Sequence, residues 1–475
     1  MLFLEVFHLH VKEFLENVCN EIKYKPITAD ISEELELHIE EGKQYYIENG
    51  FSEIEAEEKA VSNMGNAEEI GKKLNKIHRP KLDWMLLILV AILIGFGVLV
   101  IFIRASREAD TYSINRGIKF ITIGIIASGI VYFMDYRKSL KYSNWFYIIA
   151  SLLFILTIFS GHSINGSHKY LYLPGIEFST NYICTYLYII AFAGFLNKFD
   201  YEKNIVININ KFCLKIKKDI VKIFVLAIFS LFLSLLVNGV PMTLLIAISY
   251  VISTTFQIIK SEKNVKRNLI ILYSVIAIIF ICFSIFVIIT RPKVYSRLVE
   301  SSMNNDSEYN FTHRYNGWYG VKINEVLESA NFTSGIEQEN MDVSYFGLFD
   351  GGTCHALITI IAYYGTLSLW IIVATITLLF IKLILNCKNI NDNYGKLLIV
   401  GFSSIILLQS LVNILGNLNL IPIMDINLPF ISYGFNGLLV NMLTIAFLLS
   451  IYRRKDILFK EVNKNKKLKL KIYFE

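Results

Sequence analysis

Near the C-terminus, two long apolar runs are separated by the stretch Asn427-Leu428-Pro429-Phe430-Ile431-Ser432-Tyr433-Gly434. We expect this stretch to form a turn at the entrance of a helix, because proline cannot continue a helix from the residues before it. Such a turn is harder to obtain by chance than apolar sequence alone. The flanking runs are long enough to cross a lipid bilayer, so the turn is expected to belong to a membrane protein.

The composition of the whole chain agrees with this class. Of its 475 residues, 54% are hydrophobic and 14% are aromatic. In lipid the backbone must form helices or a closed barrel, and these apolar runs lack the alternation of strands. We therefore expect an all-α polytopic membrane protein with about ten spans of about 20 residues each, at 84–104, 116–134, 144–160, 179–196, 220–237, 241–259, 268–290, 354–382, 396–416 and 429–452.

Lysine and arginine predict the orientation of the chain. Short cytoplasmic loops carry more of these residues than external loops do. Basic loops occur at 137–141, 198–218 and 260–267, and a basic tail follows at 453–475. Both termini are therefore expected to be cytoplasmic. The net charge of +6 reflects this topology and attraction to anionic lipid headgroups, and it is not evidence for nucleic-acid binding.

The first 80 residues form a different kind of segment. They are charged, contain no span-length apolar run and show no cleavable signal peptide. Ser52 and Glu55 form a capping box that opens a helix ending at Met64. We therefore divide the chain into a cytoplasmic helical domain (1–80), a membrane domain (84–452) with a long external loop (291–353), and the basic tail (453–475).

An amphipathic helix within this first domain carries Ile31, Leu35 and Ile39 on one face, at intervals of four residues. Together with the glycine and alanine positions that follow it, this pattern resembles the permease-prefix (HAAS-like) domains that precede membrane proteins in Gram-positive bacteria. The resemblance implies an interaction or regulatory domain. A helical cap without a partner is the alternative.

The turn at 427–434 resembles the signature of the SEDS proteins (the FtsW/RodA/SpoVE family) of bacterial cell-wall synthesis. The resemblance extends over the prefix domain, the spans, the long loop and this turn. It implies a multi-pass protein of the bacterial cytoplasmic membrane that polymerises lipid II on the outer face and releases undecaprenyl pyrophosphate. It also implies a class B penicillin-binding protein, a transpeptidase, as partner.

The loop after the third span contains Asn165, Gly166 and Lys169, followed by Tyr170. It resembles a family segment with an Asn-Gly turn, and a turn beside a cation and an aromatic ring suits a pyrophosphate headgroup. Asn165 and Lys169 are therefore candidate substrate contacts. An ordinary Asn-Gly turn between spans is the alternative.

The long loop is where the family carries its essential aspartate, about ten residues after an arginine. Arg297 and Asp306 approximate this spacing, and Asp342 and Asp350 are rivals. The resemblance implies that Asp306 is the general base toward a sugar hydroxyl and that Arg297 contacts phosphate. Residues 318–332 further along this loop are expected to form an amphipathic helix on the membrane surface.

Three more candidate substrate contacts lie toward the C-terminus. Gln409 and Asn413 are polar, one helical turn apart and inside a span, so they are expected to face the bundle interior. They would serve either as substrate contacts or as interhelical hydrogen-bonding groups. Ser432 belongs to the signature turn.

Two departures from the family pattern favour a different role. The Gln-Pro-Ser-Glu segment of the family is missing, and Cys354 occupies the position of a family aspartate. The alternative function is a non-catalytic member that binds or translocates lipid-linked precursor or regulates cell-wall synthesis.

No metal site is expected from the sequence. The six cysteines have no paired spacing, and the external histidines lack the short spacing of ligands: His162, His168, His313 and His355. The resemblance implies no particular cofactor, and a divalent cation is compatible with it.

Overall fold

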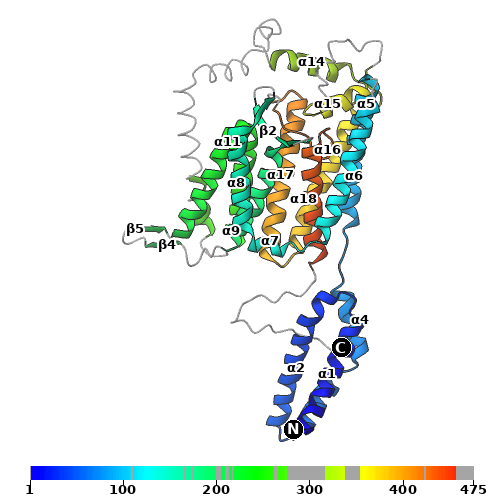
Figure 1. Ribbon diagram of the computed structural model, residues 1–475, viewed down its shortest axis with the longest axis vertical. Helices are drawn as coiled ribbons and strands as arrows, with labels where there is room; N and C mark the ends of the chain where they lie inside the picture. The colour runs from blue at the N-terminus through cyan, green and yellow to red at the C-terminus, as the bar shows by residue number, and fades with distance from the viewer. Residues whose placement is uncertain are drawn as a thin grey trace. The chain divides into compact units, whose positions relative to one another are not determined.

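The computed structural model describes residues 2–108, 111–164, 167–173, 176–198, 205–208, 213–216, 218–260, 265–270, 272–274, 316–336, 353–421 and 424–455. The chain divides into two compact units, Met1–Leu82 with Tyr452–Glu475, and Asp83–Ile451. Helices dominate both units, which confirms the all-α class (Figure 1).

The first unit contains α1 (Leu2–Glu21), a 3-10 turn (Lys25–Ile27), α2 (Thr28–Glu48), α3 (Glu53–Met64) and α4 (Ala67–Ile77). The capping box of α3 is confirmed, because the Ser52 hydroxyl accepts from Glu55 N and the Glu55 carboxylate accepts from Ser52 N. The stripe of three residues on α2 is buried. Helix α1 was not expected, and it packs against α4 so closely that a Cβ on Gly71 would lie 2.6 Å from the Glu21 Cβ.

The second unit is a helical bundle. Among the described residues, seven helices are long and apolar enough to cross a membrane. They are α5 (Trp84–Glu108), α6 (Thr111–Phe133), α8 (Ser143–Ser160), the Gly239–Lys260 part of α11 (Lys218–Lys260), α16 (Leu367–Lys388), α17 (Asn393–Asn417) and α18 (Phe435–Arg453). The Val221–Val237 part of α11 is a shorter apolar helix. These helices make the chain a multi-pass membrane protein.

Helices α9 (Thr180–Asn197) and α17 form the centre of the bundle. Most residues of α9 are buried around its whole circumference. In α17, 72% of the most apolar stretch is buried. Helix α9 packs against α8, α11 and α17. A helix buried on all sides has no lipid-facing stripe, so its place in the bundle could not be read from periodicity.

The start of α5 is joined to α16 by a buried polar cluster. Asp83 is only 4% exposed, and its carboxylate lies 3.2 Å from Lys382 Nζ. The same carboxylate accepts hydrogen bonds from Asn386 Nδ2 (2.7 Å) and from Leu86 N (3.2 Å). Asp83 therefore caps α5 and pairs with α16 at once.

The expected span at 354–382 is wrong in one respect, because the structure divides it into α15 (Ala356–Tyr364) and α16. Gly365 separates them with a φ of 80°. Leu367 N donates to Phe332 O (2.8 Å), and a Cβ on Gly365 would lie 2.6 Å from Asn331 O. The apolar run continues through this break, so hydropathy alone does not reveal it. The 268–290 span lies mostly outside the described residues.

Two small antiparallel sheets were also not expected. The first has β1 (His162–Ile164), β2 (Ser167–Leu173) and β3 (Ile176–Ser179) in that order, and the second pairs β4 (Ile205–Asn208) with β5 (Cys213–Ile216). In the first sheet Tyr170 pairs with both His162 and Ser179. These strands lie in loops between spans, where a search for membrane-length runs gives no signal.

Two further helices complete the unit. A short α7 (Arg137–Lys141) precedes α8, and α14 (Asn316–Ser329) lies across one end of the bundle (Figure 1). Asn419, just after α17, donates from Nδ2 to Asn324 Oδ1 (3.1 Å) and Gly320 O (3.4 Å) of α14. The helix expected around 318–332 is thus confirmed, and it is attached to the end of α17.

Candidate functional site

The 427–434 turn is held in shape by one hydroxyl group. Leu428 N donates to Ser432 Oγ (2.8 Å), and Ser432 Oγ donates to Thr353 O (2.6 Å), just before α15. Phe430 has a φ of 67°, which side chains other than glycine rarely adopt, so the contacts around the turn hold a strained backbone. Helix α18 begins directly after Gly434. The expected turn at a helix entrance is therefore confirmed.

Two helices enclose this turn. On α5, a Cβ at Gly97 would lie 2.7 Å from Phe430 O, so the helix contacts the backbone of the turn directly. From α9, the Tyr182 hydroxyl accepts a hydrogen bond from Asn427 N (3.3 Å). The turn is thus packed between elements that are distant from it in sequence.

The asparagines of α17 join the turn to α15. Asn413 Nδ2 donates to Cys354 O (2.8 Å) and to Ile426 O (2.8 Å). One helical turn later, Asn417 Nδ2 also donates to Cys354 O (2.9 Å), and its Oδ1 accepts from Ile358 N (3.2 Å). These bonds satisfy backbone groups at the entrance of α15 and just before the turn. Asn413 therefore acts as a hydrogen-bonding group that ties α17 to these two non-helical segments.

Gln409 differs from Asn413 in its surroundings. It is fully buried, and among the described residues neither of its amide atoms has a hydrogen-bond partner of good geometry. It lies near the Tyr186 hydroxyl, which donates to Asn441 Oδ1 (2.9 Å). A buried amide without a partner costs roughly 1–3 kcal/mol. Water or a ligand group commonly accounts for such an atom.

The entrance of α15 also carries a thiol beside an imidazole. Cys354 Sγ lies 3.4 Å from His355 Nδ1, and Cys354 is partly exposed while His355 is buried. Among the described residues, no group of three or more histidine, cysteine, aspartate or glutamate side chains could hold a metal ion.

The structure joins two of the predicted site residues, Asn413 and Ser432, through adjacent carbonyl groups before α15, and Gln409 lies one helical turn from Asn413 on α17. Lys169 lies on β2. Asn165, Arg297 and Asp306, with the rivals Asp342 and Asp350, lie outside the described residues.

Four residues of this region were not predicted: Thr353, Asn417, Tyr182 and Asp425. Asn417 had a signal in the sequence, since it repeats Asn413 one turn later in an apolar run. Asp425 is an exposed carboxylate that interacts electrostatically with Tyr182. Thr353 and Tyr182 contribute through contacts that no local pattern encodes.

The fold and this site define a polytopic helical membrane protein. In it, a polar seam formed by the hydrogen bonds of Asn413 and Asn417 lies beside the locked turn, the 427–434 segment closed by Ser432. A family model described as "Cell cycle protein" (FtsW, RodA and SpoVE) matches residues 351–457. The chain is 23% identical over 398 residues to a probable peptidoglycan glycosyltransferase FtsW of Nitrosomonas europaea, covering 79% of this chain and 94% of the relative. It is 35% identical over 95 residues to the corresponding protein of Bacillus subtilis, covering 18% of this chain and 24% of that one.

Solved structures show the same fold. One belongs to a study of polymerization and crosslinking by a peptidoglycan synthase complex, with a TM-score of 0.62 and 17% identity over 79% of this chain and 98% of that one. The rod shape determining protein RodA of Thermus thermophilus has a TM-score of 0.54 and 15% identity over 79% of this chain and 97% of that one. These matches support a divergent relative of the SEDS (FtsW/RodA/SpoVE) proteins, which the chain resembles along most of its length.

Proposed function

We propose that this protein is a peptidoglycan glycosyltransferase that polymerises lipid II at the outer face of the bacterial cytoplasmic membrane. The observation that carries the proposal is the locked turn, where Ser432 and Asn413 join the 427–434 segment, the entrance of α15 and α17. The names of the FtsW relatives and a fold shared along almost the whole of a peptidoglycan synthase chain support it.

In this proposal Asp306 is the general base. It accepts the proton of the acceptor sugar hydroxyl while a glycosidic bond forms and the bond from the donor sugar to pyrophosphate breaks. Undecaprenyl pyrophosphate is the leaving group, and the cations of Lys169 and Arg297 stabilise its charge. Asn165 supplies a turn whose backbone meets the phosphates, and a divalent cation on the pyrophosphate is compatible with this scheme.

The three described candidates have different roles in the proposal. The polar atoms of Asn413 and Ser432 are engaged with backbone groups, so these residues position the site. Gln409 is buried and, among the described residues, has no hydrogen-bond partner of good geometry, so it is the stronger candidate for contact with a substrate or a water molecule. Asp425 is a second carboxylate that could replace Asp306 as the base.

The second candidate function is a non-catalytic member that binds or translocates lipid-linked precursor or regulates its use. The observation in its favour is the α15 entrance, where Cys354 occupies the position of the expected carboxylate and lies beside His355. In either role we propose cytoplasmic termini, a class B penicillin-binding transpeptidase as partner, and a 1–80 domain that mediates interaction or regulation.

The test uses the purified full-length protein with fluorescent lipid II. We expect polymer from the wild type and from Asp135→Asn, a matched control in a partly exposed ion pair with Arg137, and none from Asp306→Ala. Polymer from Asp306→Ala but not from Asp425→Asn would move the base to Asp425. Absence of polymer from the wild type, even with its cognate transpeptidase, would favour the non-catalytic function.

A further inference from the structure

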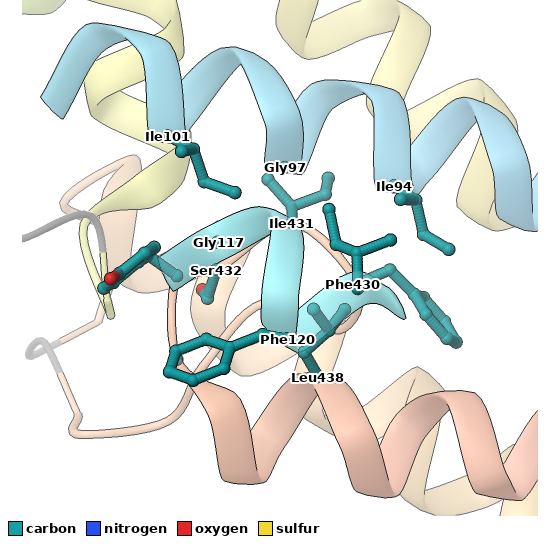
Figure 2. A pocket seen from close by; sticks show the side chains of 12 residues that line it. Ile94, Gly97, Ile101, Gly117, Phe120, Phe430, Ile431, Ser432 and Leu438 are labelled. Carbon is teal, nitrogen blue, oxygen red and sulfur yellow. The ribbon is translucent and has the colours of Figure 1, made fainter. Parts of the chain in front are cut away.

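A small apolar pocket lies between α5, α6, the 427–434 turn and the start of α18 (Figure 2). Figure 2 shows side chains of α5 and of the turn converging on it from two sides. Its apolar lining includes Ile94, Ile101, Phe120 and Ile431, and it has room for about one water molecule. Gly117 brings α6 close to α5, because a Cβ there would lie 2.6 Å from Ile101 Cδ1.

One wall of the pocket is helix α6, which lies on the outside of the bundle. Only 11% of the most apolar stretch of α6 is buried, the lowest share among the membrane-length helices described. Ile118 is 55% exposed and Ile125 is 59% exposed, and both lie on the flank of α6 beside the pocket-lining Gly117. An acyl chain lying along this flank would run beside the pocket.

Cationic side chains stand at the aromatic rim of this pocket. The Arg104 guanidinium lies 4.7 Å from the centre of the Tyr433 ring, and that of Arg116 lies 5.4 Å from the centre of the Phe120 ring. Both rings line the pocket. Lys119, beside Phe120, is exposed. Guanidinium groups suit phosphate because their planar donors match its oxygens.

We propose that this place binds a glycerophospholipid with an anionic headgroup, such as phosphatidylglycerol. One acyl chain lies against the pocket, and the phosphate is held by Arg104 and Arg116. Because the pocket has room for only about one water molecule, an unbranched acyl chain fits against it better than a methyl-branched polyprenyl chain. The lipid would brace α5 and α6 against the turn that Gly97 contacts, and this site does not depend on the proposed enzymatic activity.

The experiment is native mass spectrometry of the delipidated full-length protein with added phosphatidylglycerol or phosphatidylcholine. Each cation near an anionic headgroup adds about 1 kcal/mol, or about fivefold, to the binding affinity. Removal of two cations, about 2 kcal/mol, should therefore weaken the affinity about 30-fold. We expect the double variant Arg104→Gln/Arg116→Gln to bind phosphatidylglycerol about 30-fold more weakly than the wild type. Binding of phosphatidylcholine should be weak and equal in both.

The matched control is Arg137→Gln/Lys138→Gln, which removes two exposed charges away from the pocket and should bind phosphatidylglycerol as the wild type does. If the double variant does not fold, Arg116→Gln alone should weaken binding about fivefold, since Arg116 is exposed. Equal binding by the variant and the wild type would overturn the proposal. So would displacement of the lipid by glycerol phosphate, or stronger binding of undecaprenyl phosphate than of phosphatidylglycerol.

Discussion

Gln409 and Asn413 offer a direct test of which buried amide stabilises the bundle. They lie one turn apart on α17 and are both buried, yet Asn413 donates to two carbonyl groups, whereas the Gln409 amide has no partner of good geometry in the described part of the chain. We expect the near-isosteric change Asn413→Leu to lower stability and the change Gln409→Met to leave it unchanged or raise it slightly. The comparison holds the helix, the depth in the bundle and the side-chain size nearly constant.

The magnitude follows from the groups left unpaired. Asn413→Leu removes the donor to Ile426 O, at a cost of about 1–3 kcal/mol, and one of two side-chain donors to Cys354 O, at a cost of about 1 kcal/mol. The total loss is about 2–4 kcal/mol. Gln409→Met removes an unpaired buried amide and should leave stability unchanged or raise it by about 1 kcal/mol.

The assay is thermal unfolding of the full-length protein in detergent, followed by tryptophan fluorescence, with lipid II polymerisation measured on the same samples. We expect Asn413→Leu to lower both the midpoint and the activity. Gln409→Met should keep the midpoint and lose activity if the amide meets substrate or water. The reasoning is refuted if Asn413→Leu melts with the wild type, or if Gln409→Met is destabilised equally.

Three further changes test other parts of the structure. Asp83→Ala breaks the buried ion pair with α16 and should lower the free energy of unfolding by about 3 kcal/mol. Asp83→Asn keeps a hydrogen-bond acceptor and should lower it less. Equal unfolding midpoints for the two variants would contradict this. Gly97→Val would drive a side chain into the carbonyls of the 427–434 turn and should lower the free energy of unfolding by about 1–3 kcal/mol. Gly95→Val should be nearly neutral, because a Cβ there meets nothing within 4 Å. Similar losses of stability in the two variants would refute the close approach of α5 to the turn. Burial alone would lower the pKa of Lys43, but hydrogen bonds from it to Glu57 and a neighbouring glutamate raise the pKa overall above 10.5. This stabilisation of the first unit is present below pH 10.5 and is lost as pH rises through the higher folded-state pKa of Lys43. Proteolysis within α2 and α3 should therefore accelerate above pH 10.5 more in the wild type than in Lys43→Met. Equal acceleration in the two proteins would exclude the effect.

The family signature could be recognised from the sequence because it is local. Proline and the residues around it specify a turn, and Ser432 supplies the hydroxyl that closes it. The seam behind that turn could not be recognised in the same way. Tyr182 and Thr353 contact the turn although they lie 245 and 79 residues away in the sequence, and no local sequence pattern links either of them to it.

The sequence by itself determined the membrane class and the helices α2 and α3 of the first unit. Apolar runs of membrane length partition into lipid whatever their neighbours are, and the capping box at Ser52 depends only on residues close in the chain. These properties are local or additive, so they can be read without a structure.

Only the tertiary structure decided the break at Gly365, the central position of α9, and the different roles of Gln409 and Asn413. In each case the outcome depends on partners from distant segments. The carbonyls of 331–334 approach Gly365, and Cys354 O and Ile426 O engage Asn413. Hydropathy predicts that a polar side chain in a span will turn inward, but the groups it meets there are determined by packing.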